Sequence, residues 1–403
     1  MTHSRETSLV FRWRPLLAAV ILVGALGGCG SANGSSATPS VPSPRGDFYT
    51  PPDPLQPAAA GTLIWAEQVA GLEDIQPPAT VWRILYHSRS RDNVDIAVSG
   101  LAVVPTAAPP DGGRPVYAWA HGTVGLGDQC APSREPRENL PPYGGMQVER
   151  GAVLVATDYE GLGTPGIPTS TVAAAHSHAV LDSIRAAAAL PNVGGLGDVV
   201  VAGHSQGGAA ALTAAEMSLT YAPELELVGV VALAPGVELP ALVDHLATTS
   251  TGAAMALIGA VGLRAGYPDL DLATMFTPSA TADVARLETE CLDDTIARYQ
   301  ALSTSDVVAN EPSTLPKLQA LLAENSPGAV TPGVPVFLGH GEDDQKVPVE
   351  LSDVLGGKYC ALGVSVVRHV YAGDHDAVID EALDDAMAFI QARFDHEPVV
   401  STC

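Results

Sequence analysis

The stretch from residue 199 to residue 217 constrains the fold more than any other part of the chain. The run Val199–Ala202 leads into Gly203-His204-Ser205-Gln206-Gly207-Gly208, and an alanine-rich segment follows directly. The β-branched run predicts a buried strand, and the alanine-rich segment predicts a helix. Small residues two positions before and after Ser205 let the strand and the helix approach closely, and the sharp turn strains the serine backbone. The pattern therefore predicts a serine hydroxyl exposed at a helix N-terminus, where the helix dipole favours negative charge.

Strand-like and helix-like segments alternate along much of the remaining chain. Residues 83–90 and 95–105 alternate apolar and polar residues on either side of a turn, which predicts an antiparallel meander. Later runs are almost continuously apolar, as in strands buried on both faces of a parallel sheet: 115–120, 152–158, 199–205, 227–234, 335–339 and 364–370. Helices are expected at 174–189, 206–221 and 376–394. We therefore expect an α/β fold, with a mostly parallel, twisted sheet and helices on both faces.

The alternation stops between Pro235 and Pro332. Helical segments fill this stretch, among them the apolar section Ala253–Leu263, and no strong strand is present. A loop of this length is not expected to be structureless inside a compact domain. We expect residues 237–330 to form a helical cap over the C-terminal edge of the sheet, where open α/β folds bind ligands. Residues 61–403 would then form one domain that includes the cap.

The N-terminus has the features of an export signal. Three arginines precede an apolar run from Leu16 to Gly28, which is too short to span a bilayer as a helix. The run ends in Leu-Gly-Gly-Cys, which resembles the lipobox of bacterial lipoproteins, where the cysteine becomes the lipid-modified first residue. We therefore expect residues 1–28 to be a signal peptide, Cys29 to carry lipid, and residues 29–60 to be a flexible tether. An ordinary secretory signal is the alternative.

Net charge and motif content exclude several classes of partner. The chain has 20 Lys+Arg against 45 Asp+Glu, a formal net charge of −25. Phosphate binding requires basic patches, so nucleic acid is not an expected partner, and any membrane attachment would come from the lipid anchor. The sequence contains no metal-ligand cluster, phosphate-binding loop or dinucleotide fingerprint, so we expect no metal and no cofactor. The oligomeric state stays open.

Four cysteines follow Cys29, and an even number in an exported chain favours disulfide bonds. They are Cys130, Cys291, Cys360 and Cys403. Four thiols permit three pairings, among which the sequence does not choose. We favour Cys130–Cys291 and Cys360–Cys403, because the second bond would fasten the extreme C-terminus.

A serine is a weak nucleophile at neutral pH, so Ser205 would need a general base and an acid that orients the base. In folds of this kind the acid and then the histidine follow the serine along the chain. The turn after the predicted strand 335–339 is rich in acids, and His375 lies in the loop after the last predicted strand. We expect His375 to be the base, because the other candidate histidines lie in or beside strands or next to Ser205: His121, His204, His340 and His369.

The acid is less clearly defined, because Glu342, Asp343 and Asp344 are consecutive. The segment 341–348 resembles the G-x-x-D-x-x-V-P turn of α/β-hydrolases, where the triad aspartate stands four residues before the proline. This resemblance selects Asp344, with Asp343 as the second choice.

Several segments together carry a resemblance to one family. They are GAVLVATDYEGLGTPG from residue 151, LDSIRAA, GHSQGG and ALAPG. With them, residues 60–403 resemble the secretory lipase family of α/β-hydrolases, the group that includes the fungal lipase A type. The DYEGLG segment is the most family-specific part. The resemblance implies hydrolysis of carboxylic esters, often acylglycerols, beneath a helical cap.

The resemblance also implies an oxyanion hole. It places Asp158, the aspartate of DYEG, beside the backbone N–H of Gln206. The backbone around Gly122, in WAHGT, resembles the HG loop of other esterases and is the second choice for the donor.

The leading hypothesis is therefore a lipid-anchored or secreted lipase or esterase that acts on small or lipid esters. An acyltransferase or a peptidase could use the same triad, because the cap and the acyl pocket decide between these reactions. A non-catalytic surface lipoprotein that binds lipids is the alternative from a different class.

Overall fold

A computed structural model describes residues 41–72 and 77–403 of the chain. The predicted signal peptide at 1–28, the lipidation site at Cys29 and the first part of the tether lie outside the described residues. Within them, no helix is both long enough and apolar enough to cross a bilayer.

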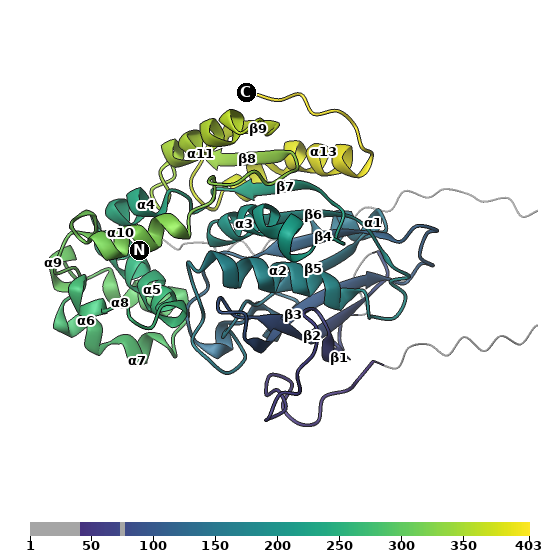
Figure 1. Cartoon of the computed structure of the whole chain (residues 1–403), viewed down its shortest axis with the longest axis horizontal. Coiled ribbons are helices and arrows are strands. Elements are labelled where there is room, and N and C mark those ends of the chain that lie inside the picture. The colour runs from purple at the N-terminus through teal and green to yellow at the C-terminus, as the bar shows by residue number, and fades with distance from the viewer. Residues whose placement is uncertain (1–40, 73–76) are drawn as a thin grey trace, which may run out of the picture. The chain divides into compact units, whose positions relative to one another are not determined.

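A nine-stranded sheet forms the centre of the domain, in the order β1-β2-β3-β5-β4-β6-β7-β8-β9 (Figure 1). β2 pairs antiparallel with β1 on one side and β3 on the other, and β3 pairs antiparallel with β5. The remaining strand pairs of the sheet are parallel. The strands are β1 (Leu63–Gln68), β2 (Ala79–Arg89), β3 (Asp95–Pro105), β4 (Arg114–Ala120), β5 (Val153–Thr157), β6 (Leu196–His204), β7 (Leu227–Leu233), β8 (Val336–Gly341) and β9 (Val366–Tyr371). The predicted antiparallel meander and parallel sheet are confirmed.

Helices cover both faces of this sheet. Alternate residues of each strand face opposite sides, so that Val116 and Ala118 of β4 lie in one apolar core while Tyr117 and Trp119 lie in another. The first core includes side chains of α2 (Ala173–Ala187), α3 (Gln206–Tyr221) and α11 (Val349–Ala361). The second includes side chains of α1 (Gly144–Glu149), α12 (Val378–Glu381) and α13 (Leu383–Phe394).

The segment between β7 and β8 folds as the predicted helical cap and has its own apolar core. Its helices gather beyond one end of the sheet (Figure 1). They are α4 (Leu239–Leu246), α5 (Ser250–Gly266), α6 (Pro278–Ala282), α7 (Val284–Leu287), α8 (Leu292–Tyr299), α9 (Thr304–Val307) and α10 (Pro316–Glu324). The apolar faces of these cap helices pack against one another, which removes them from water without contact with the sheet.

The expected tether is too long at its C-terminal end. Phe48 and Tyr49 are 5% and 6% exposed and pack against Trp65 and Leu85. The indole N–H of Trp65 donates to the Phe48 carbonyl over 3.0 Å. The prediction of a flexible tether was therefore wrong for residues 41–60, because two adjacent aromatic side chains outweigh the surrounding Pro and Ser.

Two disulfide bonds join distant parts of the chain, in the pairings favoured above. Cys130–Cys291 links the loop after β4 to the start of α8 in the cap, across 161 residues. Cys360–Cys403 fastens the C-terminus to α11, across 43 residues.

We predict that the Cys130–Cys291 bond stabilises the attachment of the cap. A bond that closes so long a loop restricts the unfolded chain, which contributes about 2–4 kcal/mol in typical proteins. The double variant Cys130→Ser/Cys291→Ser should therefore lower the free energy of unfolding in urea by that amount. An unfolding midpoint equal to that of the wild type would contradict this.

Candidate active site

Ser205 occupies a tight turn between β6 and α3. Its backbone has φ 57° and ψ −122°, a strained conformation for a residue with a side chain. A Cβ on Gly203 would lie 2.1 Å from the carbonyl oxygen of Gly207, and a Cβ on Gly207 would lie 1.9 Å from that of Ala120. No side chain fits at either position. The two glycines of the motif therefore hold the serine at the helix N-terminus.

Asp344 and His375 meet in the loops that follow β8 and β9. The Nδ1 of His375 is 2.6 Å from Oδ2 of Asp344, and both residues are buried. The other carboxylate oxygen of Asp344 accepts the backbone N–H groups of Lys346 and Val347, each over 2.8 Å. Glu342 and Asp343 are exposed at the surface. Of the three consecutive acids, the structure thus brings Asp344 to His375.

Two further histidines, for which the sequence predicts no role, support this pair. Nδ1 of His340 lies 2.6 Å from the Ser352 hydroxyl oxygen, and its Nε2 lies 3.1 Å from Oδ2 of Asp344. Burial raises the pKa of Asp344, but the hydrogen bonds from His340 and His375 outweigh burial and hold that pKa well below its usual range. The spacing of four residues between His340 and Asp344 was the signal available in the sequence.

His204 holds the loop that carries His375. Its Nε2 donates to the His375 carbonyl over 2.8 Å, and the two ring centroids are 4.6 Å apart. Burial and the neighbouring His375 lower the pKa of His204 to about 4, so the ring is neutral at pH 7. The residue before the serine therefore holds the His375 loop in place.

The prediction that Asp158 is an oxyanion donor was wrong. Its carboxylate accepts the hydroxyls of Ser99 and Ser133 over 2.6 and 2.5 Å and the backbone N–H of Ser133 over 3.0 Å. Its own N–H donates to the Ser99 carbonyl. Both routes by which an aspartate could donate are thus used within the scaffold. Burial raises the pKa of this carboxyl, and the serine hydrogen bonds oppose that rise.

The loop after β4 faces the serine instead. A Cβ on Gly122 would lie 3.5 Å from the Cβ of Ser205. The Tyr159 hydroxyl donates to the His121 carbonyl over 2.9 Å, and the Thr123 hydroxyl donates to the Gln206 side chain over 3.3 Å. The second choice, the backbone around Gly122, therefore lies beside Ser205.

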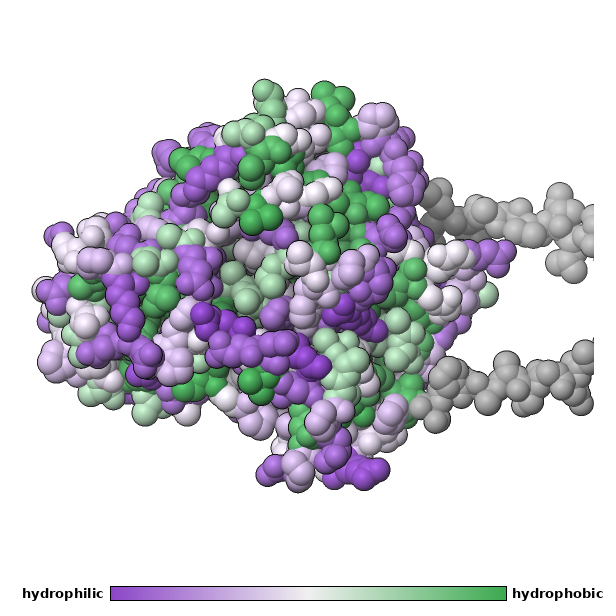
Figure 2. Space-filling view, in the orientation of Figure 1, coloured by the Kyte–Doolittle hydropathy of each residue, from purple (hydrophilic) through white to green (hydrophobic). Residues whose placement is uncertain are grey.

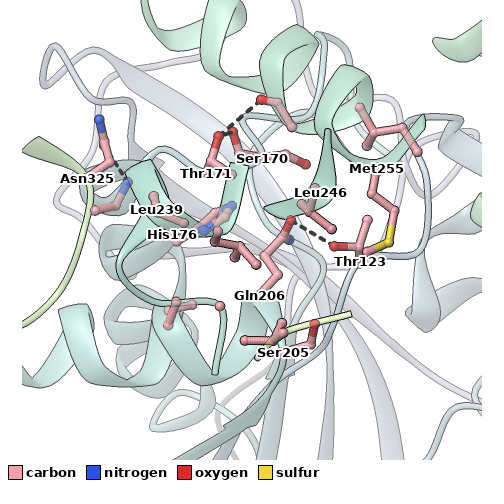
Figure 3. Close-up of a pocket in the computed structure, with 18 of the residues that line it drawn as sticks. Thr123, Ser170, Thr171, His176, Ser205, Gln206, Leu239, Leu246, Met255 and Asn325 are labelled. Carbon is pink, nitrogen blue, oxygen red and sulfur yellow. Dashed lines mark hydrogen bonds between the residues drawn. The ribbon is translucent and has the colours of Figure 1, made fainter. Parts of the chain in front are cut away.

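A cavity of about 90 Å³ adjoins Ser205 and is roofed by the cap (Figure 3). Its apolar lining comes mainly from α3, α4 and α5: Ala209, Ala210, Leu239, Leu242, Leu246, Met255 and Ile258. The polar and charged residues that line it include Thr123, His176, Asn325 and Lys346. Burial, with a smaller effect of His121, lowers the pKa of His176 to about 3, so this ring adds no charge to the cavity at pH 7.

His204, His375 and Asp376 have possible metal-ligand atoms within 4.8 Å of one another. Each already has another partner: His204 donates to a carbonyl, His375 binds Asp344, and Asp376 pairs with Lys346 over 2.8 Å. We assign no ion to this group.

The fold and the site define the class. A mostly parallel sheet, a strained serine before a helix, and a buried His–Asp pair on the loops after β8 and β9 are the parts of an α/β-hydrolase. The chain belongs to the secretory lipase family, because the model of that family matches residues 146–402. The protein is thus a carboxylic-ester hydrolase. The secretory family and the two disulfide bonds indicate that it is exported.

Sequence relatives extend over most of the chain. It is 25% identical to lipase A of Moesziomyces aphidis, over 88% of this chain and 81% of that protein. It is 27% identical to the secreted triacylglycerol lipase LIP2 of Malassezia globosa, over 82% of this chain and 76% of that protein. It is also 27% identical to a Mycobacterium tuberculosis protein named "Probable inactive lipase MT1628", over 80% of this chain and 75% of that protein.

Solved structures show the same fold. Candida antarctica lipase A superposes with a TM-score of 0.77 at 21% identity, over 88% of this chain and 87% of that one. The cell-wall-degrading esterase LipA of Xanthomonas oryzae superposes with a TM-score of 0.68 at 18% identity, over 84% of this chain and 98% of that one.

Glu160, the residue after Tyr159, should make the stability of the fold depend on pH. Burial raises its pKa from 4.5 to about 7; the Thr169 hydrogen bond opposes this and the charge of Asp92 adds to it. The folded state binds the Glu160 proton more tightly than the unfolded state does. The contribution of this proton to the free energy of unfolding is therefore fully present below pH 4.5 and is lost as pH rises to about 7. The loss is at most about 3 kcal/mol.

The variant Glu160→Gln should therefore lose less stability than the wild type between pH 4.5 and 7 in urea unfolding experiments. Parallel stability curves for the two proteins across this range would show that the carboxyl does not titrate as described.

Proposed function

We propose that Ser205, His375 and Asp344 form a catalytic triad that hydrolyses carboxylic esters through an acyl-enzyme. The observation that carries the proposal is the combination of a strained serine on the turn after β6 with the 2.6 Å His375–Asp344 contact. All three residues follow strands of the parallel part of the sheet, so they lie at one edge.

In this mechanism the Ser205 oxygen attacks the ester carbonyl carbon while its proton passes to Nε2 of His375. The Asp344 carboxylate accepts the Nδ1–H and stabilises the imidazolium that forms. The tetrahedral intermediate collapses, and the alcohol leaves with the proton from His375. Water then attacks the acyl-enzyme by the same proton transfers and releases the carboxylic acid and free Ser205.

The backbone N–H of Gln206 and the backbone after His121 would stabilise the oxyanion. Gln206 is the first residue of α3, and the first N–H groups of a helix have no acceptor within it. Gly122 lies close to Ser205, since a Cβ on Gly122 would lie 3.5 Å from the Cβ of Ser205. Donors fixed in place before the reaction begins stabilise developing charge most effectively.

The acyl chain would lie in the apolar cavity under the cap. An acyl group extending from Ser205 meets Leu239, Leu242 and Leu246 of α4 and buries its methylene groups there, at about 0.8 kcal/mol each. Acylglycerols are therefore the substrates that we propose. The fungal relative named a triacylglycerol lipase supports this choice.

We also propose that a lipid on Cys29 holds the enzyme at a membrane. Eleven residues lie between Cys29 and Val41, the first described residue. A chain of that length spans at most about 40 Å, so the domain would stay close to the lipid surface.

Hydrolysis of p-nitrophenyl butyrate tests the triad. We expect Ser205→Ala to abolish turnover and Asp344→Asn to lower kcat by about ten-thousand-fold, since the imidazole would lose its orienting partner. Asp343→Asn is the matched control, because its exposed side chain should change kcat by less than about twofold.

Folded wild-type protein that turns over no ester would overturn the proposal and favour a non-catalytic lipid-binding protein, as the name of the mycobacterial relative allows. Faster cleavage of peptide p-nitroanilides, or transfer of the acyl group to an added alcohol in preference to water, would instead favour a peptidase or an acyltransferase.

A further inference from the structure

Two hollows of the molecule share three lining residues, which form the wall between them. The active-site cavity and an outer groove both contain Ala173, Thr213 and Asn325 among their lining residues. The outer groove has a volume of about 390 Å³, and both charged and apolar residues line it. The polar and charged side chains, besides Thr213 and Asn325, are Arg91, Asp92, Glu216, Tyr267, Glu324 and Ser326. Figure 2 shows the surface hollowed where the cap meets α2 and α3.

Asn325 is the part of this wall that belongs to the cap. It follows α10 directly and is 5% exposed. Its Oδ1 accepts the backbone N–H of Ala173, the first residue of α2, over 2.9 Å. Its Nδ2 donates to the Tyr267 hydroxyl over 2.9 Å and to the Leu321 carbonyl over 2.8 Å. Three hydrogen bonds thus fix the amide across the gap between the cap and the core.

The other two members of the wall cannot close it alone. Ala173 offers a single methyl group. The Thr213 hydroxyl is turned to the core, where it donates to the Ala210 carbonyl over 3.2 Å and lies 3.0 Å from the Ser177 hydroxyl. The carboxamide of Asn325 is therefore the largest group between the two hollows. Figure 3 shows Asn325 well apart from Ser205, with His176 and Leu239 between them in the view.

The space on the inner side is small. By the ~10–15 Å³ needed for one water-sized group, a cavity of about 90 Å³ holds roughly six to nine such groups. A short acyl chain fits between Ser205 and the wall, whereas a long chain requires more room. The outer groove begins at the same three residues, and Met217, Ala329 and Val330 give it apolar surface.

We propose that Asn325 is a plug that sets the upper limit of acyl-chain length. The inference rests on the proposed function, because it requires the acyl group to extend from Ser205 into the cavity. Esters with chains up to about eight carbons are the preferred substrates, and removal of the carboxamide joins the cavity to the outer groove so that longer chains pass through.

The experiment compares kcat/KM for p-nitrophenyl esters of 4, 8, 12 and 16 carbons. In the wild type we expect kcat/KM to fall steeply beyond eight carbons. In Asn325→Ala the ratio of the 16-carbon to the 4-carbon value should rise tenfold or more, with the 4-carbon value close to that of the wild type. If Asn325→Ala does not accumulate as folded protein, Asn325→Ser tests the same point, since its hydroxyl can still accept the Ala173 N–H.

Tyr267→Phe and Asn325→Leu are the controls. They distinguish a carboxamide that blocks the passage by its size from one that only links the cap to the core through hydrogen bonds. Tyr267→Phe removes one hydrogen bond of the amide but leaves the amide in the wall, and Asn325→Leu keeps the bulk without the hydrogen bonds. Both should keep the wild-type chain-length profile. An unchanged ratio in Asn325→Ala, or an equal rise in all three variants, would overturn the plug. Hydrolysis of the 4-carbon ester that depends on Ser205 would, in either case, leave the proposed triad standing.

Discussion

The contact between the serine turn and the end of β4 is the constraint on which the site depends. The backbone of Gly207 lies so close to the Ala120 carbonyl that a Cβ would sit 1.9 Å from its oxygen. This approach requires glycine, starts α3 immediately beside the sheet, and forces Ser205 into its strained conformation. His121, Gly122 and Thr123 follow Ala120 directly, so the same contact sets the loop that faces the serine.

Buried polar groups then hold the loops in place before any substrate binds. A buried carboxylate is costly unless it is hydrogen-bonded, and Asp344 is bound by two backbone N–H groups and two imidazoles. His204 fastens the His375 loop through its carbonyl, and Asp158 ties the segment at Ser133 to β3 and β5. Such prior ordering lowers the reorganisation that a reaction would require.

The sequence was most informative where backbone requirements are strict. The glycines around Ser205, the β-branched runs and the order of the acid and the histidine are local patterns, and they predicted the sheet, the serine turn and the residues that meet at the His375–Asp344 pair. Asp158 shows the limit of a motif: DYEG marks the family, but the partners of its carboxylate, Ser99 and Ser133, lie 59 and 25 residues away and leave no local signature. The packing of Phe48 and Tyr49 was concealed for the same reason, because Trp65 and Leu85 form their site only after β1 and β2 have paired.

The cap depends both on local sequence patterns and on contacts between residues far apart in the chain. Its helical character and position followed from a long stretch without strands, whereas the wall that Asn325 completes depends on three elements: α10, α2 and the end of α5. Apolar side chains of α4 and α5 line the cavity beside Ser205, and none of the described residues that line it is Asp or Glu. The proposed apolar acyl group is therefore compatible with the acidic composition of the chain.

The most direct test of the central claim is to map the nucleophile chemically. The full-length protein would be treated with a p-nitrophenyl phosphonate, and its intact mass and proteolytic peptides would be measured. The account predicts one phosphonyl group per chain, attached to Ser205, with none added to unfolded protein. A folded protein that takes up no phosphonyl group, or takes it up on another residue, would contradict the account.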